Sequence, residues 1–303
     1  MKQFLWIVAV SAGVLTCGRT AAQQQQQAFD SAGIVGGPLK QVPGQFSFTE
    51  GAAVDGKGNI FFTDQPNNKI WEYRLDGQLV LFMDSAGRSN GMYFDRKGRL
   101  IACADENDQL WAIDKNKKVK VLLMDLGGRR FNGPNDLWID PQGGIWFTDP
   151  YYQRDYWTRT KADLEAQNVY YLAPGASQAV LAADGLKQPN GIVGTPDGRF
   201  LYVSDLGAGK TYKYQIGAGG RLSGRELFCS KGSDGMTLDA QGDVYLTGNG
   251  VTVYNASGRN VAYIPVPEKW VGNLCFGGAD RKTLFITASA GIYTVPMVVR
   301  GVE

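Results

Sequence analysis

The sequence predicts an all-β protein with the architecture of a six-bladed β-propeller. One hairpin pattern recurs six times, and its copies begin 40, 45, 55, 44 and 39 residues apart. Each copy is followed by further strand-like runs, and a period near 40–45 residues with about four strands per unit is typical of propeller blades. The 40 glycines and the repeated Asp-x-x-Gly turns also favour many short strands over long helices.

Residues 1–22 are predicted to be a signal peptide. Lys2 precedes an apolar run of 13 residues from Phe4 to Thr16, too short to span a bilayer, and small residues end the segment at Ala22. Cys17 could mark a lipoprotein anchor, but the residues before it fit that pattern poorly. We therefore expect an exported protein, periplasmic or secreted, with no membrane attachment after cleavage.

The rest of the chain divides into a linker and one domain. Residues 23–35 begin with a glutamine tract and are expected to form a flexible Gln-rich linker. Residues 36–303 are expected to form the propeller, as a single catalytic domain. Within it, the segment GGPLKQV at 36–42 is expected to add an outer strand to the last blade and so close the ring.

Each blade begins with a hairpin such as NDLWIDPQGGIWFTD, whose first strand should line the central channel. That strand runs away from its leading residue, turns at Asp-x-x-Gly and is followed by a returning strand. The leading residue and the residue ending the second strand therefore lie on the same face. The six leading residues are Glu50, Asn90, Asn135, Asn190, Asp234 and Asn273. We expect them to form a ring around the axis; the alternative is that the Asn-Gly pairs are ordinary turns.

Composition excludes several kinds of function. The chain has no histidine, which rules out Ser-His-Asp triads, Cys-His dyads and His-ligated zinc. Removing Lys2 and Arg19 with the signal peptide leaves 29 basic and 29 acidic residues, and no basic stripe with aromatic residues indicates a nucleic-acid partner. Cys103, Cys229 and Cys275 lie in apolar strand-like runs and are expected to be small buried residues.

The ring offers carboxylate and amide oxygens, which hard cations prefer. Glu50 and Asp234 would repel each other without a cation between them, and Asn190 would add a ligand without adding charge. We expect a divalent cation, Ca²⁺ first, with Mg²⁺, Mn²⁺ or Zn²⁺ as alternatives. Because no histidine is present, the general base must be a carboxylate, and Asp234 is the best candidate.

Three further aspartates end second strands on the same face, namely Asp64, Asp149 and Asp205. Each could support a ligand of the ring from behind, or could cap the turn that follows its strand.

The third blade carries an insertion at 151–167. Tyr170 follows Asp149 by 21 positions, whereas the corresponding distance in the first blade is 7 positions. The insertion should rise beside the mouth of the ring as a lid. Its Tyr151, a candidate substrate-binding residue, and its other aromatic and arginine side chains could stack on a sugar-like ring or merely pack on the blade. Those other side chains are Tyr152, Arg154, Tyr156 and Trp157.

Four segments resemble the gluconolactonase-like family, also called the SMP-30/regucalcin family: FTEGAAVD, RFNGPNDLWIDPQGGIWFTDP, QPNGIVGTPDGRFLYVSD and SDGMTLDAQGDVYLTG. They occur in order along the whole chain after the signal peptide. The resemblance implies a six-bladed propeller with a divalent cation on its axis.

The resemblance also assigns roles to residues. It implies that Glu50, Asn190 and Asp234 bind the metal and that Asp234 also acts as acid and base. Asn135 corresponds to a residue that contacts substrate or holds the metal through water. Arg130 is the nearest match to the family's substrate-binding arginine, displaced here by an extra Gly-Pro.

The function predicted from these observations is a metal-dependent hydrolase that opens a small sugar lactone, such as a gluconolactone, to the aldonic acid. One alternative is a phosphotriesterase or other ester hydrolase at the same metal site, although related phosphotriesterase propellers carry histidines near the metal. The other alternative is a non-enzymatic propeller that binds a glycan or a protein. The carboxylate pair of Glu50 and Asp234 favours an enzyme, because a passive scaffold does not need it.

Overall fold

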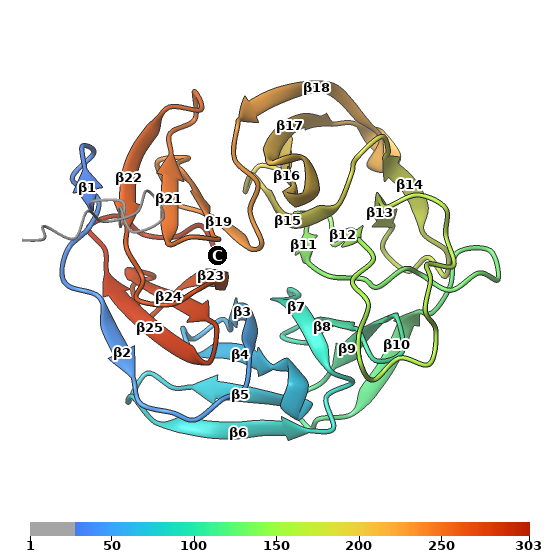
Figure 1. The fold of residues 1–303 in the computed structure, drawn as a ribbon, viewed down its shortest axis with the longest axis horizontal. Coiled ribbons are helices and arrows are strands. Elements are labelled where there is room, and N and C mark those ends of the chain that lie inside the picture. The colour runs from blue at the N-terminus through green and yellow to red at the C-terminus, as the bar shows by residue number, and fades with distance from the viewer. Residues whose placement is uncertain (1–27) are drawn as a thin grey trace, which may run out of the picture.

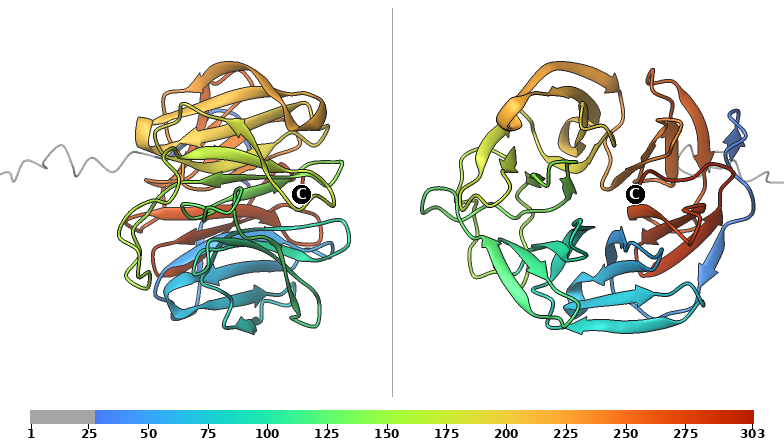
Figure 2. Two further views of the ribbon diagram at one scale, coloured as in Figure 1. Left: turned by 90° about the vertical axis from the view of Figure 1, so that its right-hand side faces the viewer. Right: turned by 180° about the vertical axis from the view of Figure 1, so that it is seen from behind.

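A computed structural model describes residues 28–303, which form six antiparallel sheets around a central axis (Figure 1). The fold is the six-bladed β-propeller predicted from the sequence. Views from the side and from behind show the sheets radiating from this axis (Figure 2). No helix in these residues is long and apolar enough to cross a bilayer. The predicted signal peptide, residues 1–22, lies outside the described residues and stays a prediction.

Blades one to three each contain four strands, ordered from the axis outwards in Figure 1. Blade one contains β3 (Thr49–Val54), β4 (Ile60–Asp64), β5 (Lys69–Tyr73) and β6 (Leu79–Asp84). Blade two contains β7 (Ser89–Phe94), β8 (Leu100–Ala104), β9 (Gln109–Ile113) and β10 (Val119–Leu123). Blade three contains β11 (Leu137–Ile139), β12 (Ile145–Asp149), β13 (Asn168–Leu172) and β14 (Val180–Ala183).

Blades four to six repeat this plan with additions from the N-terminal part of the chain. Blade four contains β15 (Pro189–Gly194), β16 (Phe200–Asp205), β17 (Lys210–Ile216) and β18 (Leu222–Cys229). Blade five contains β19 (Met236–Leu238), β20 (Val244–Leu246), β21 (Val251–Tyr254), β22 (Asn260–Ile264) and the added β1 (Phe29–Asp30). Blade six contains β23 (Val271–Gly277), β24 (Thr283–Ala288), β25 (Gly291–Pro296) and the added β2 (Lys40–Val42). Three short 3₁₀ helices occur in the described chain: η2 (Gln65–Asn67), η3 (Leu206–Ala208) and η4 (Ala218–Gly220).

The hairpin turns form where the sequence places Asp-x-x-Gly. In blade one the Asp55 carboxylate accepts backbone N–H bonds from residues 57, 58 and 59 at 2.8–2.9 Å. Asp140 and Asp239 make equivalent bonds in blades three and five. The short aspartate side chain thus satisfies the donors of a tight turn, which holds the first two strands of a blade in register.

The N-terminal segment closes the ring as predicted, and it also adds a strand to blade five. β2 pairs with β25, so residues 40–42 supply the outer strand of blade six. The linker predicted over residues 23–35 is wrong for its C-terminal part. Residues 29–30 pair with β22 of blade five, and Ile34 is fully buried in the core between the last two blades. An aspartate in this segment, Asp30, caps the turn by accepting N–H bonds from Ile34 and Val35.

The core lies between neighbouring blades, where apolar side chains from facing sheets pack together. Its largest fully buried side chain is Trp146, which lies in a cluster formed by blades three, four and five. Cys103, Cys229 and Cys275 are buried and unpaired, as the sequence predicted. The rigid wall built in this way fixes the ends of the innermost strands, which carry the polar side chains described next.

Candidate active site

The leading residues of the six blades lie at or just before the start of the innermost strands. Steric contacts show that consecutive blades meet there. A Cβ placed on Gly51 would lie 1.9 Å from the carbonyl oxygen of Asn90, and one placed on Gly272 would lie 2.6 Å from Oε1 of Glu50. The second contact joins blade six to blade one. Only glycine permits this close approach, so the glycines beside the leading residues let the six blades converge.

The innermost strands are irregular where the leading residues lie. The register of pairing with the second strand shifts between Glu50 and Ala53 in blade one. Comparable shifts occur at the same end of blades two, four and six. Such bulges break the strict alternation of side chains and re-aim them.

Three carboxylates crowd together at this end of the strands: Glu50, Asp234 and Asp136. Burial, followed by the negative charges of Asp234 and Asp136, raises the pKa of Glu50 well above its usual value. Burial raises the pKa of Asp234 to about 6 and that of Asp136 to about 8. Such clustering of buried acids is costly for a scaffold and typical of a functional site.

Asp234 is held by an indole. Nε1 of Trp270 donates a hydrogen bond of 2.5 Å to Oδ2 of Asp234, which lowers the pKa of this carboxyl against the effect of burial. Trp270 immediately precedes β23, so blade six positions the carboxylate of blade five. A carboxylate held in one orientation is suited to exchanging a proton with a group in front of it.

Asn190, beside Asp234, has a side-chain oxygen that makes no hydrogen bond. Its Nδ2 donates to the Tyr152 hydroxyl at 3.0 Å, while its Oδ1 is buried and has no hydrogen-bond partner in residues 28–303. The amide nitrogen also lowers the pKa of Asp234, so the two side chains are neighbours. A buried oxygen that accepts no hydrogen bond is unusual in a folded protein and indicates a position for a ligand.

The positive charge near the carboxylates comes from Arg154 in the insertion. Its guanidinium lowers the pKa of both Glu50 and Asp234. Its Nε lies 3.1 Å from Oδ2 of the buried Asp105, which follows β8 of blade two. Arg130, the arginine matched by sequence, lies elsewhere: it is half-exposed, and its Nε is 3.8 Å from Asp108 and Asp163.

The insertion crosses from blade three to blade two and is anchored there. Nε1 of Trp157 donates to the carbonyl of Asp105 at 2.9 Å, and the Tyr156 hydroxyl contacts the carboxylate of the same residue. Arg159 pairs with the buried Asp108 at 2.6 Å. The aromatic residues Tyr156 and Trp157 therefore contact blade two, whereas Tyr152 and Arg154 lie beside the carboxylates.

The other two candidate substrate-binding residues are Tyr151, whose side chain makes contacts within the insertion, and Asn135, whose backbone links two blades. Tyr151 neighbours Tyr152, but its hydroxyl contacts Gln153 within the insertion, and its ring lies 5.9 Å from that of Trp157. Asn135 is buried, and its backbone links blades two and three by accepting a bond from Gly91 N–H at 2.7 Å. Nothing in these contacts opposes a role for the Asn135 side chain, so both assignments stay predictions.

Asp64, Asp149 and Asp205 share one role in the structure. Each ends a second strand and accepts N–H bonds from the two consecutive residues that lead into the innermost strand of its own blade. In blade one these donors are Ser47 and Phe48, two or three residues before Glu50. The three aspartates therefore fix the backbone that carries the leading residues. Asp205 also accepts a bond from the N–H of Ala208 and so caps η3 as well.

Sequence reasoning missed Asp136 and Trp270. Asp136 follows the leading Asn135, at a position where four of the other five blades have glycine. That break in the repeat is a signal that could have identified a carboxylate among the blades. Trp270 lies in the connection before blade six, where nothing in the sequence indicates that its indole reaches Asp234.

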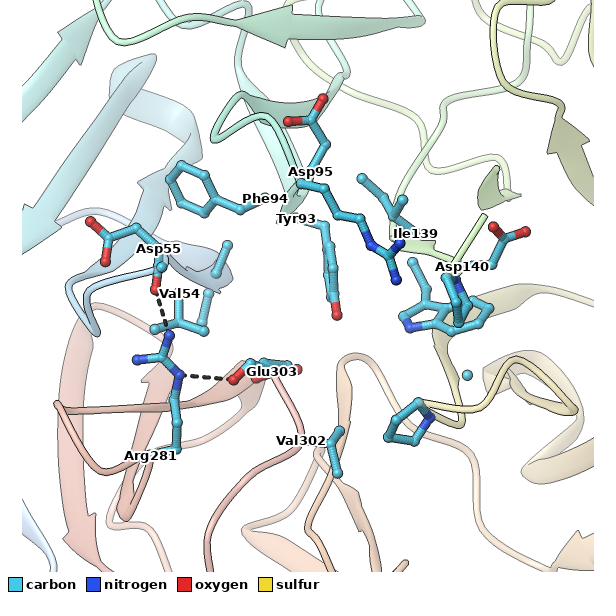
Figure 3. A pocket seen from close by; sticks show the side chains of 18 residues that line it. Val54, Asp55, Tyr93, Phe94, Asp95, Ile139, Asp140, Arg281, Val302 and Glu303 are labelled. Carbon is cyan, nitrogen blue, oxygen red and sulfur yellow. Dashed lines mark hydrogen bonds between the residues drawn. The ribbon is translucent and has the colours of Figure 1, made fainter. Parts of the chain in front are cut away.

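The opposite end of the axis has a cavity of about 320 Å³. It is lined by hairpin-turn residues such as Asp55, Asp95 and Asp140, so it opens on the face away from the carboxylates. Glu303 and Tyr93 project into it, and Arg281 donates bonds to the backbone carbonyls of Glu303 and Asp55 (Figure 3). The acids lining this cavity are mostly occupied by their own turns, which makes it a weaker candidate for chemistry.

The geometry defines a class: a six-bladed propeller with a pair of neighbouring carboxylates, an unpartnered amide oxygen and a guanidinium at one end of its axis. Within residues 28–303, no three side chains of the types His, Cys, Asp and Glu are grouped to hold a metal by themselves. A hard cation here would need Asn190 beside Glu50 and Asp234. The chain belongs to the SMP-30/Gluconolactonase/LRE-like region family, whose model matches residues 48–290.

Individual relatives agree with this family. A gluconolactonase from Zymomonas mobilis is 26% identical over 291 residues, covering 85% of this chain and 81% of the relative. A solved gluconolactonase from Xanthomonas campestris superposes with a TM-score of 0.82 at 28% identity, covering 89% of this chain and 93% of that one. A calcium-binding regucalcin from Agrobacterium tumefaciens, at 20% identity and a TM-score of 0.72, covers 90% of this chain and 96% of its own and shares the fold.

Proposed function

We propose that this protein is a hydrolase that opens a sugar lactone to its aldonic acid, with a divalent cation held by Glu50, Asn190 and Asp234. The family and the gluconolactonases similar to this chain support lactone hydrolysis. The observation that carries the proposal is the buried Glu50 and the half-buried Asp234, with Asn190 beside Asp234 and its Oδ1 unpartnered.

The donor set fits a hard cation. Without one, burial raises the pKa of both Glu50 and Asp234, and the negative charge of Asp234 raises that of Glu50 further. Oδ1 of Asn190 is buried and free because Nδ2 of the same amide donates to Tyr152. Carboxylate and amide oxygens together suit Ca²⁺ best and leave Mg²⁺, Mn²⁺ and Zn²⁺ as alternatives. When bound, such a cation would act as a Lewis acid on the lactone carbonyl.

The protein groups have separate tasks in this proposal. Asp234, oriented by Trp270, accepts a proton from the attacking water and returns it to the ring oxygen that leaves. Arg154 adds positive charge near the carbonyl oxygen, where negative charge develops as water attacks the carbonyl carbon. Tyr152 holds the amide of Asn190 and lines the space in which the sugar ring must lie. Because histidine is absent from the chain, no imidazole can replace Asp234.

The test combines a substrate screen with one substitution. Hydrolysis of glucono-1,5-lactone and of a phosphotriester is measured with added Ca²⁺, Mg²⁺, Mn²⁺, Zn²⁺ or a chelator. We expect lactone hydrolysis that the chelator abolishes, and a loss of at least about 10²-fold in kcat for Asp234→Asn at saturating metal. Asp243→Asn is the matched control, since it removes a buried carboxylate of the same blade at the hairpin-turn end. Turnover of the phosphotriester alone, or of neither compound, would refute the proposal.

A further inference from the structure

Lys231 lies on the same face as the carboxylates, in the connection between β18 and β19, three residues before Asp234. Its Nζ and the Cη2 atom of Trp270 are both 3.6 Å from the position that a Cβ on Gly248 would occupy. Gly248 follows β20, and its positive φ of 127° and missing side chain leave this space open. The ammonium group and the far edge of the indole therefore border the same space beside blade five.

The ammonium group has no counter-ion in the described chain. No carboxylate of residues 28–303 lies within 4.0 Å of its Nζ, whereas Lys213 in β17 pairs with Glu226 at 3.9 Å. Lys231 is partly buried, and this burial lowers the pKa of its amine. Burying an ammonium group without an anion costs free energy, and an anionic ligand would recover it.

Trp270 connects this amine to the proposed reaction centre. Its Nε1 donates a hydrogen bond to Asp234, and the opposite edge of its ring borders the space beside Gly248 that Lys231 also borders. A sugar lactone whose carbonyl lies between Glu50 and Asp234 can extend along the indole, which offers an apolar surface to the ring carbons. The substituent on the carbon farthest from the carbonyl would then reach Lys231.

We propose that Lys231 binds an anionic group, such as a phosphate, sulfonate or carboxylate, carried by the lactone on the carbon farthest from its carbonyl. The preferred substrate is then an anionic sugar lactone, with Lys231 as its specificity residue. This inference rests on the proposed lactonase function and narrows its substrate class.

The experiment compares kcat/KM for glucono-1,5-lactone and for its 6-phosphate. We expect wild-type protein to prefer the phosphorylated lactone and Lys231→Met to lower the ratio of the two values by about 10- to 100-fold, the range for a hydrogen bond to a charged group. Lys231→Arg should retain part of the preference. Lys210→Met removes an exposed lysine at the start of β17 and should leave the ratio unchanged.

Binding separates this inference from the function on which it rests. Calorimetry with 6-phosphogluconate and gluconate on the wild type and Lys231→Met measures the anionic contact without turnover. If neither lactone is hydrolysed but Lys231→Met weakens binding of 6-phosphogluconate alone, the lactonase proposal fails and the anion site stands. If lactones are hydrolysed but neither the kcat/KM ratio nor this binding depends on Lys231, the inference is overturned and the lactonase proposal stands.

Discussion

Replacing Trp270 with phenylalanine should change the pH dependence of catalysis in a predictable direction. The substitution keeps an aromatic ring but removes the 2.5 Å hydrogen bond from Nε1 to Oδ2 of Asp234. This bond stabilises the charged carboxylate, whose pKa burial has already raised to about 6. A hydrogen bond to a charged group contributes about 1.5–3 kcal/mol, and about 1.4 kcal/mol corresponds to one pKa unit. Trp270→Phe should therefore raise the pKa of Asp234 by about one to two.

The assay is kcat for lactone hydrolysis between pH 5 and 9 at saturating metal. The acidic limb of the profile should move upward by about one to two pH units, so kcat on that limb should fall. Trp146→Phe is the matched control, because it removes an indole bond to Asp140 at the hairpin-turn end of blade three. It should lower stability without moving the limb. A limb that stays in place for Trp270→Phe, or moves to lower pH, would refute the assignment of Asp234 as the base.

Three further outcomes are expected. Glu50→Gln should raise the melting temperature without Ca²⁺ at pH 8, because it relieves repulsion among the neighbouring carboxylates. The same substitution should reduce the stabilisation that Ca²⁺ gives. Equal wild-type melting temperatures with Ca²⁺ and with chelator would contradict the cation site. Asp105→Asn should lower the free energy of unfolding by about 3 kcal/mol in urea titrations. This is the low end of the range for breaking a buried ion pair, because Arg154 keeps some solvent contact. A loss under about 1 kcal/mol would mean that Asp105 does not anchor the insertion. Burial raises the pKa of Glu303 from 4.5 to about 7, so its stabilising effect is present below 4.5 and is lost as the pH rises through 7. Urea titrations at pH 5 and 8 should show a smaller decline for Glu303→Gln than for wild type, and equal declines would refute this role.

The repeat made the fold predictable in detail. Six copies of one hairpin determined the number of blades, and Asp-x-x-Gly located the turns because aspartate satisfies the turn donors locally. The closing strand at 40–42 was predictable because a ring needs a partner for β25. The pairing of β1 with β22 was not, since two residues carry no strand signal and their partner is distant in sequence.

The candidate site was predictable where it follows the repeat, and the insertion was expected to rise on the same face. Glu50, Asn190 and Asp234 occupy equivalent positions in their blades, so alignment of the hairpins locates all three. Arg154 and Trp270 reach the same place from an insertion and a connection, whose paths depend on tertiary contacts such as the pairing with Asp105. Periodicity contains no information about those paths.

The closure of the ring by residues near the start of the chain also governs how the protein can fold. Thr49 bonds to the carbonyl of Gly291, 242 residues away, and β2 must find β25. Closing so long a loop has an entropic cost that no local contact repays, and contacts of this kind slow folding. Blade six provides this partner only after nearly the whole chain has been synthesised. The contact of Gly272 with Glu50 needs the same closure, so the complete ring of leading residues assembles last. A nascent chain thus carries Glu50 and Asn190 long before the ring that brings them together is complete.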